Sequence, residues 1–214
     1  MHIEVLVEDS SGCVLVDAVL PHVIGPQGDP HTWRAHAYKG IGRLPKDLKN
    51  RADPAKRALL EQLPRLLRGY GRTQGIDAVV IVLDSDQRDC KVFLHELQAI
   101  AKRCRPAPTT LFRLAIEEAE AWFLGDRKAL FAAYPKAKKN VLMRYRQDSV
   151  CGTWELLADA VHIGGHAAIS AAGWPLQGQA KHEWARRIAP HMDVENNNSP
   201  SFVKFRDGLR RLVA

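Results

Sequence analysis

The stretch "DAVVIVLDSDQRD", residues 77–89, decides the fold. Its apolar run predicts a strand over residues 77–84, and the lack of polar alternation indicates that both faces are buried, as in a parallel sheet. Asp84, Asp86 and Asp89 then follow within six positions. Aspartate favours turns, so these acids have an ordinary structural explanation. The alternative is that their carboxylates hold a divalent cation at the edge of an active site.

Three more stretches, residues 2–8, 31–38 and 109–117, have the composition of strands. Helical patterns cover residues 10–23, 53–71 and 89–104, and a further helix over 117–134 is expected to break near Gly125. Strands that alternate with helices predict an α/β protein with an open, mostly parallel four-stranded sheet flanked by helices.

The remaining chain reads as helices over residues 153–161, 166–174, 179–192 and 199–213. We therefore expect an α/β domain over residues 1–125 and a helical extension packed on it over residues 126–214. Three helix starts are predicted from capping patterns: Ser10 or Ser11 as an N-cap, Asp53 before Pro54, and Ser199 before Pro200. One helix is expected to turn Val92, Phe93, Leu97 and Ile100 inward. The tryptophans are expected to be core or helix-packing residues and not platforms for base stacking: Trp33, Trp122, Trp154, Trp174 and Trp184.

The composition is that of a folded protein, with 46% hydrophobic and 26% charged residues in 214. Apolar runs stay well short of the about 20 residues of a membrane-spanning helix, and the first residues lack the pattern of a signal peptide, so we expect a cytoplasmic protein without a membrane. The four cysteines form no C-x-x-C pair, which argues against a zinc knuckle. The net charge of +7 favours a polyanionic partner, above all nucleic acid.

Acidic residues recur where the predicted strands end. The first strand runs into Glu8 and Asp9, the third into Asp84, and the fourth into Glu117, Glu118 and Glu120. The carboxyl ends of parallel strands share one edge of a sheet, where ligands bind. Like charges gathered there repel one another, and a bound Mg²⁺ or Mn²⁺ would remove the conflict. Each acid also has a structural interpretation as a helix cap, a turn residue or a solvated charge.

These acids carry a resemblance to a known family. A strand that ends in Glu8 and a later buried strand that ends in Asp84-x-Asp86 resemble the toprim domain of topoisomerases, primases and OLD-family nucleases. Over nearly its full length the chain resembles a bacterial toprim-like family of unknown function, through "VED" at 7–9, "KGIGRLPKDL" at 39–48, "LDSDQRD" at 83–89, "EEAEAWFL" at 117–124 and "NSPSF" at 198–202. The chain departs from the toprim pattern at Asp9, where a glycine often follows the glutamate.

The resemblance implies roles for these side chains. Asp84 and Asp86 would coordinate Mg²⁺ or Mn²⁺, and Glu8 would act as a general acid or base or as a ligand of a second ion. Glu120, together with Glu118, would complete a second metal site. Asp89 lies where many toprim proteins carry a further acid. The candidates for a cation that neutralises developing negative charge are Lys181 and Lys39.

The basic loop "KGIGRLPK" lacks the residue order of a phosphate-binding Walker A loop. Its Lys39, Arg43 and Lys46 are candidates for contact with a nucleic-acid backbone, although a solvated loop explains them equally well.

We expect a metal-dependent nuclease, or a subunit derived from one, that acts on DNA or RNA phosphodiesters. The resemblance implies a role in bacterial defence beside a separate ABC- or AAA-type ATPase, because this sequence contains no P-loop; a homo-oligomer is a further candidate assembly. The alternatives are a non-catalytic nucleic-acid-binding or regulatory subunit, and a small-molecule phosphohydrolase, which a deep enclosed pocket would favour.

Overall fold

The computed structural model describes residues 1–45 and 58–214. Four strands form one sheet in the order β2-β1-β3-β4, with every neighbouring pair parallel. The strands are β1 (His2–Val7), β2 (Thr32–Ala37), β3 (Ala78–Asp84) and β4 (Thr109–Ala115). The predicted α/β fold with an open parallel sheet is thereby confirmed. In the register Val7 lies beside both Ala37 and Val82, so the central strands end at the same level.

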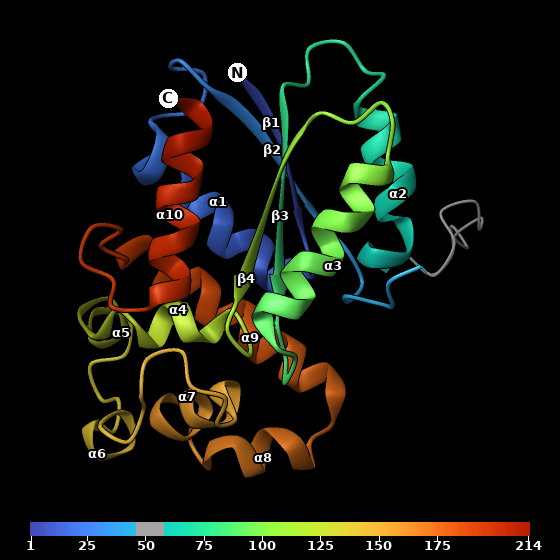
Figure 1. Ribbon diagram of the computed structural model, residues 1–214. Helices are drawn as coiled ribbons and strands as arrows, with labels where there is room; N and C mark the ends of the chain where they lie inside the picture. Colours follow the sequence, from blue (N-terminus) through green and yellow to red (C-terminus); the bar gives the residue numbers. More distant parts are fainter. Residues whose placement is uncertain (46–57) are drawn as a thin grey trace.

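Helices cover both faces of this sheet (Figure 1). On one face lie α2 (Leu59–Tyr70) and α3 (Cys90–Arg103), and on the other lie α1 (Ser10–Ile24) and the C-terminal helix α10 (Pro200–Val213). Alternate residues of β3 belong to two separate hydrophobic clusters, with Val80 in one and Ile81 in the other. Both faces of β3 are therefore buried, as its unbroken apolar sequence predicts.

The second half of the chain adds helices at the carboxyl edge of the sheet and beside it (Figure 1). They are α4 (Glu120–Leu124), α5 (Arg127–Ala133), α6 (Lys139–Leu142), α7 (Thr153–Val161), α8 (Gly165–Ala171), α9 (Trp174–Ile188), the 3-10 helix η2 (Ala189–His191) and α10. The predicted break at Gly125 is confirmed, because α4 ends one residue before it. A side chain there would clash with Asn197 and Ser199.

Helices α4 and α10 belong to the same hydrophobic cluster as one face of the sheet. Trp122 stacks edge-on against Phe202, with ring centroids 5.4 Å apart, and lies 4.9 Å from the ring of Phe205. Its indole N–H donates to Ser201 Oγ at 2.9 Å. These contacts join α4 to α10, and the predicted division into a domain over residues 1–125 and an extension over residues 126–214 stays a prediction.

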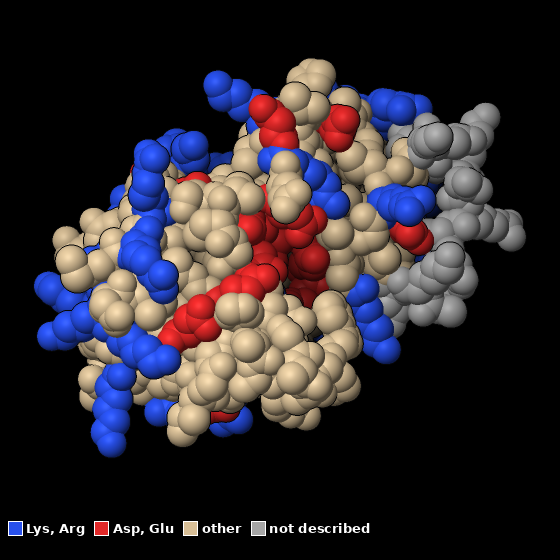
Figure 2. Space-filling model, turned by 90° about the horizontal axis from the view of Figure 1, so that it is seen from below, with Lys and Arg blue, Asp and Glu red and all other residues tan. Residues whose placement is uncertain are grey.

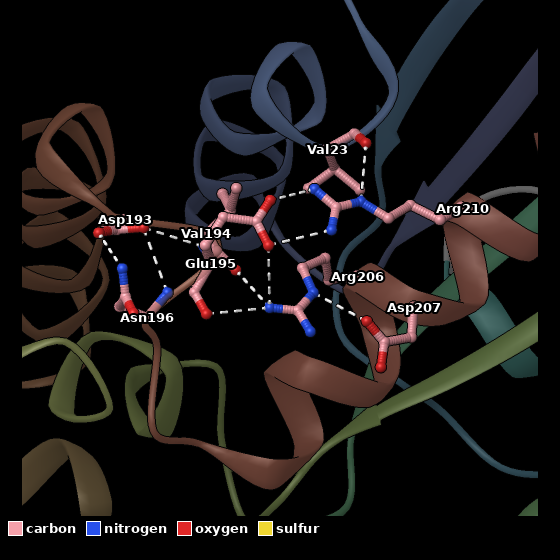
Figure 3. A network of polar contacts seen from close by, with 8 residues as sticks. All are labelled: Val23, Asp193, Val194, Glu195, Asn196, Arg206, Asp207 and Arg210. Atoms are coloured by element: carbon pink, nitrogen blue, oxygen red, sulfur yellow. Dashed lines mark hydrogen bonds and ion pairs between the residues drawn. The ribbon is translucent and has the colours of Figure 1, made fainter.

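Ion pairs fix α10 to the loop before it and to the end of α1 (Figure 3). Arg210 pairs with both carboxylate oxygens of Glu195, one of them at 3.1 Å, and donates from Nε to the carbonyl of Val23 at 3.3 Å. Arg206 donates to the carbonyl of Val194 at 3.0 Å. These two arginines are thus engaged in holding the fold, which removes them from the positive charge available to a polyanion.

Several details differ from the sequence-based expectations. The N-cap of α1 is Asp9, not Ser10 or Ser11, because its carboxylate accepts the N–H of Gly12 at 2.7 Å. Val92 is 58% exposed, since the buried face of α3 runs through Phe93 and a neighbouring residue is rotated about 100° away. The expected helix start at Asp53 lies outside the described residues. The Ser199 cap is confirmed by its side-chain bond to the N–H of Phe202.

The largest difference concerns α9. It begins at Trp174 with Pro175 in the first turn, whereas the sequence predicted a start at residue 179. The left-handed backbone of Gly173, with φ of 87°, separates it from α8. Trp174 is 82% exposed, so its predicted place in the core is wrong, unlike that of Trp33, Trp122 and Trp184, which are buried. Over the ranges described, no helix is long and apolar enough to cross a membrane.

Candidate active site

Three strand ends bring acids together at the carboxyl edge of the sheet. Glu8 directly follows β1, Asp84 is the last residue of β3, and Glu120 opens α4 shortly after β4. The backbone N–H of Asp84 donates to Oε2 of Glu8 at 3.3 Å. Viewed from this edge, acidic side chains gather in a central hollow, while Lys and Arg side chains lie around its periphery (Figure 2).

Lys181 of α9 lies within this cluster, and its side chain is only 13% exposed. Its Nζ is 2.9 Å from Oε1 of Glu118 and 3.6 Å from Oε2 of Glu120. Burial alone would lower the pKa of the ammonium, but the carboxylates of Glu120 and Glu118 raise it well above its ordinary range. Lys181 is therefore a permanent cation held between two of the predicted site residues.

The acids of the cluster are only partly compensated, Glu8 and Asp84 being half-buried and Glu120 fully buried. Burial raises the pKa of Glu8 from 4.5 to about 7, with the negative charges of Asp86 and Asp9 adding to the effect. Burial likewise raises the pKa of Glu120 to about 7 and that of Asp84 well above its ordinary value. Within the part of the chain that the structure describes, the carboxylate of Asp84 accepts no hydrogen bond. A proton or a cation would satisfy it.

The cluster thus has two halves. Lys181 lies closest to Glu118 and Glu120, and its charge also acts on Glu8 and Asp84, which have no salt-bridge partner of their own within the described residues. Beside these two, a cavity of about 10 Å³ is lined by Glu8, Asp9 and Asp84 together with apolar residues. That is close to the smallest volume that holds a single water molecule.

The described residues contain no group of three or more His, Cys, Asp or Glu side chains arranged to hold a metal ion. This limits the kind of cation site that the cluster could form. Mg²⁺ is commonly bound through only one or two carboxylates and keeps several waters. Glu8 and Asp84, as hard oxygen donors, fit that requirement and not that of a closed protein cage.

Asp86 is at the rim of the cluster. It has a left-handed backbone with φ of 47°, its side chain is 51% exposed, and it pairs with Arg88 at 2.8 Å. Ser85, which sequence reasoning did not single out, fixes this turn: it is buried, and its hydroxyl accepts the N–H of Glu117 at 2.8 Å. In the sequence, the position of Ser85 between Asp84 and Asp86 is the signal that could have indicated its role in this turn.

Two of the acids near this edge have structural roles. Asp89 is the N-cap of α3, where its Oδ1 accepts the N–H groups of Lys91 and Val92 at 2.9 Å, and these bonds lower its pKa. Glu117 accepts the N–H groups of Cys151, Gly152 and Thr153 at the start of α7, at 2.9 to 3.0 Å. Metal binding by Asp89 stays a prediction, since the structure only gives it a cap.

The basic loop after β2 begins beside the cluster. The N–H of Gly40 donates to the carbonyl of Glu8 at 3.1 Å, and that of Tyr38 to the carbonyl of Val7 at 3.0 Å. Lys39 and Arg43 in this loop are exposed. Lys46, the third residue predicted to contact nucleic acid, lies outside the described residues.

Comparison of the chain with protein-family models, with curated proteins and with solved structures finds no match. The resemblance to toprim proteins therefore remains a prediction from short motifs, and the function has to be argued from the geometry at the carboxyl edge of the sheet.

Proposed function

We propose that this protein is a Mg²⁺- or Mn²⁺-dependent phosphodiester hydrolase of toprim-like type, that is, a nuclease. One observation carries the proposal: Glu8, Asp84 and Glu120, from three separate strand ends, lie around the buried Lys181 in one hollow. Burying carboxylates without donors costs stability. Acids that remain destabilised at the ligand-binding edge of a sheet are typical of a functional site.

Each residue has a role that follows from its surroundings. Glu8 and Asp84 would hold the ion, which when bound polarises a phosphoryl oxygen and lowers the pKa of water. Lys181 supplies a fixed positive charge for the phosphate, because Glu118 and Glu120 orient its ammonium. Glu8 is placed to bind the ion or to transfer a proton, and its pKa of about 7 suits the second role near neutral pH.

The substrate is best taken to be a polymer. The net charge of +7 favours a polyanion, and the hollow lies open on the surface (Figure 2). A small-molecule phosphohydrolase would enclose its substrate, but the groove of about 740 Å³ along α9 is open, and the cavity lined by Glu8 and Asp84 has a volume of only about 10 Å³. That volume is far below the about 300 Å³ at which ligand pockets begin.

A second candidate function is a non-catalytic nucleic-acid-binding subunit. It is favoured by the lack, among the described side chains, of a three-ligand group already arranged for a metal ion. Both candidates predict nucleic-acid binding and differ only in cleavage. The ATPase partner, the role in defence, a homo-oligomer and the cytoplasmic location stay predictions.

Cleavage assays test the proposal. Plasmid DNA and labelled DNA and RNA oligonucleotides are incubated with the purified full chain in Mg²⁺, in Mn²⁺ and in EDTA. We expect metal-dependent cleavage that Glu8→Gln, Asp84→Asn and Glu120→Gln each lower by about 10²-fold or more, the scale of losing a catalytic acid or base. Glu96→Gln, an exposed change on α3, is the matched control.

Equal cleavage by the three site variants and by the control would overturn the assignment of the site. Nucleic-acid binding without cleavage in either metal would favour the non-catalytic candidate.

A further inference from the structure

A groove runs along α9 next to the candidate active site. Its volume is about 740 Å³, and its lining includes Ser10 at the start of α1 and Gly178, Gln179, His182 and Arg186 of α9. Ser10 directly follows Asp9, and α9 also places Lys181 among the acids. The groove therefore begins where the acidic cluster lies.

Some polar side chains of this groove are unused by the fold, although Arg187, which also lines it, donates to the carbonyl of Ala133 at 3.0 Å. Gln179, His182 and Arg186 make no hydrogen bond or ion pair with any residue in the described ranges. The acid in the groove, Glu183, pairs with Arg187 at 3.3 Å. Exposed donors and an unpaired guanidinium thus face the solvent, as a site for phosphodiester oxygens requires.

Trp174 extends this line. It is the first residue of α9, one turn before Gly178 and so on the same side of the helix, and it is 82% exposed. Exposed apolar residues also occur elsewhere, such as Ile163, so exposure alone carries no argument. An exposed indole in line with a basic groove is, however, the combination on which proteins stack unpaired bases.

We propose that this face of α9 binds single-stranded nucleic acid, with phosphates at Arg186 and His182 and a base stacked on Trp174. From Pro175 to Arg186 the helix measures about 16 Å at 1.5 Å per residue. A duplex offers no free base face to an indole, which is why a single strand fits better. That the bound strand is a substrate rests on the proposed function, but its binding can be measured without cleavage.

Gly178 offers a sharp test, because a Cβ built at this position meets no atom within 4 Å. Larger side chains therefore enter the groove without a clash, and replacing a glycine inside a helix does not lower helix stability. The full chain carrying Gly178→Glu, Gly178→Lys or Gly178→Ala is titrated into a fluorescein-labelled 20-nucleotide oligothymidylate or oligouridylate. Anisotropy is read in EDTA at 50 and 200 mM salt.

We expect Gly178→Glu to bind at least tenfold more weakly than Gly178→Lys at 50 mM salt, with Gly178→Ala close to wild type. Trp174→Ala should weaken binding about tenfold, whereas the exposed control Ile163→Ala should not. Arg186→Ala should weaken binding and flatten its salt dependence, compared with Arg144→Ala, an exposed arginine in the turn after α6.

Equal affinity of Gly178→Glu and Gly178→Lys, or no binding of a single strand, would overturn the proposal. So would a duplex of the same length bound as tightly as the single strand. Because the titration contains no metal, its outcome is separate from cleavage. If the variants bind as expected but the protein does not cleave, the binding groove is supported and the proposed nuclease function is not. If the protein cleaves but Gly178→Glu binds like the wild type, the nuclease function is supported and the binding groove is not.

Discussion

Glu117 and Glu8 are both glutamates at the carboxyl edge of the sheet, yet their surroundings are opposite. Glu117 accepts three backbone N–H bonds and the hydroxyl of Thr153, and these hydrogen bonds outweigh burial and lower its pKa. Glu8 accepts one long backbone bond, and burial raises its pKa to about 7. The same side chain thus stabilises the fold at one position and strains it at the other.

The difference separates structural acids from functional ones. An acid that receives donors from the protein is already stabilised as an anion and gains little from a metal ion. An acid buried without donors is stabilised only by a proton or a cation. The free energy that its burial costs is therefore expected at positions where a ligand binds. Glu117 and Asp89 belong to the first class, and under the proposed function Glu8, with one long backbone donor, and Asp84, with none in the described residues, belong to the second.

The largest expected effect is from Glu117→Ala. It leaves three backbone N–H groups of the first turn of α7 without their acceptor, so we expect the free energy of unfolding to fall by about 3 kcal/mol. Urea denaturation of the full chain measures it, with Glu96→Ala as a control on an exposed helix surface. A loss no greater than that of the control would break the distinction between the two classes.

The second effect concerns pH. Because the folded pKa of Glu8 and Glu120 is about 7 against an ordinary 4.5, the folded protein holds protons that the unfolded chain has released between these values. In EDTA the free energy of unfolding should therefore fall as the pH rises from 5 to 7. Each proton held in this way contributes about 1.4 kcal/mol per pH unit, so a single one gives a fall of about 2–3 kcal/mol over this range.

Urea titrations at pH 5, 6, 7 and 8 follow this slope. Asp84→Asn combined with Glu8→Gln should flatten it, since two of the coupled acids are then gone. A wild-type stability that rises over this range would mean that these acids are stabilised as anions.

The third effect has the opposite sign to that of Glu117. Asp84→Asn removes a buried charge without donors, so at pH 8 in EDTA it should raise the free energy of unfolding by about 1–2 kcal/mol. Saturating Mg²⁺ should remove this advantage, because only the wild type gains binding energy, about 2.7 kcal/mol at a hundred times Kd. Calorimetry on both proteins checks the binding; equal Mg²⁺ affinity would exclude Asp84 as a ligand.

The smallest effect is expected at Asp89, where substitutions distinguish a role as helix cap from a role as metal ligand. Asp89→Ala should cost about 1 kcal/mol, and Asp89→Asn much less, because asparagine caps helices as well as aspartate does. Both variants should bind Mg²⁺ like the wild type. Weaker Mg²⁺ binding by Asp89→Asn, with stability unchanged, would transfer Asp89 to the class of functional acids.

Much of the fold was predictable because its signals are local. The unbroken apolar run of β3 indicates burial on both faces, and the alternation of strands with helices indicates a parallel sheet. Ser199 before Pro200 marked the start of α10 correctly. The start of α9 was missed because Trp174 was assigned to the end of the preceding helix, although Gly173 and Pro175 around it are signals of a break.

The sequence by itself determined which acids would meet, since strand ends in a parallel sheet share one edge, and Glu8, Asp84 and Glu120 do lie close together at that edge. Only the tertiary structure decided what each acid does there. The start of α7 supplies Glu117 with donors from residues 151–153, and α9 supplies Lys181 to Glu118 from 63 positions away. Such partners are distant in sequence, and a carboxylate's pKa depends on the donors and charges that the folded chain places around it.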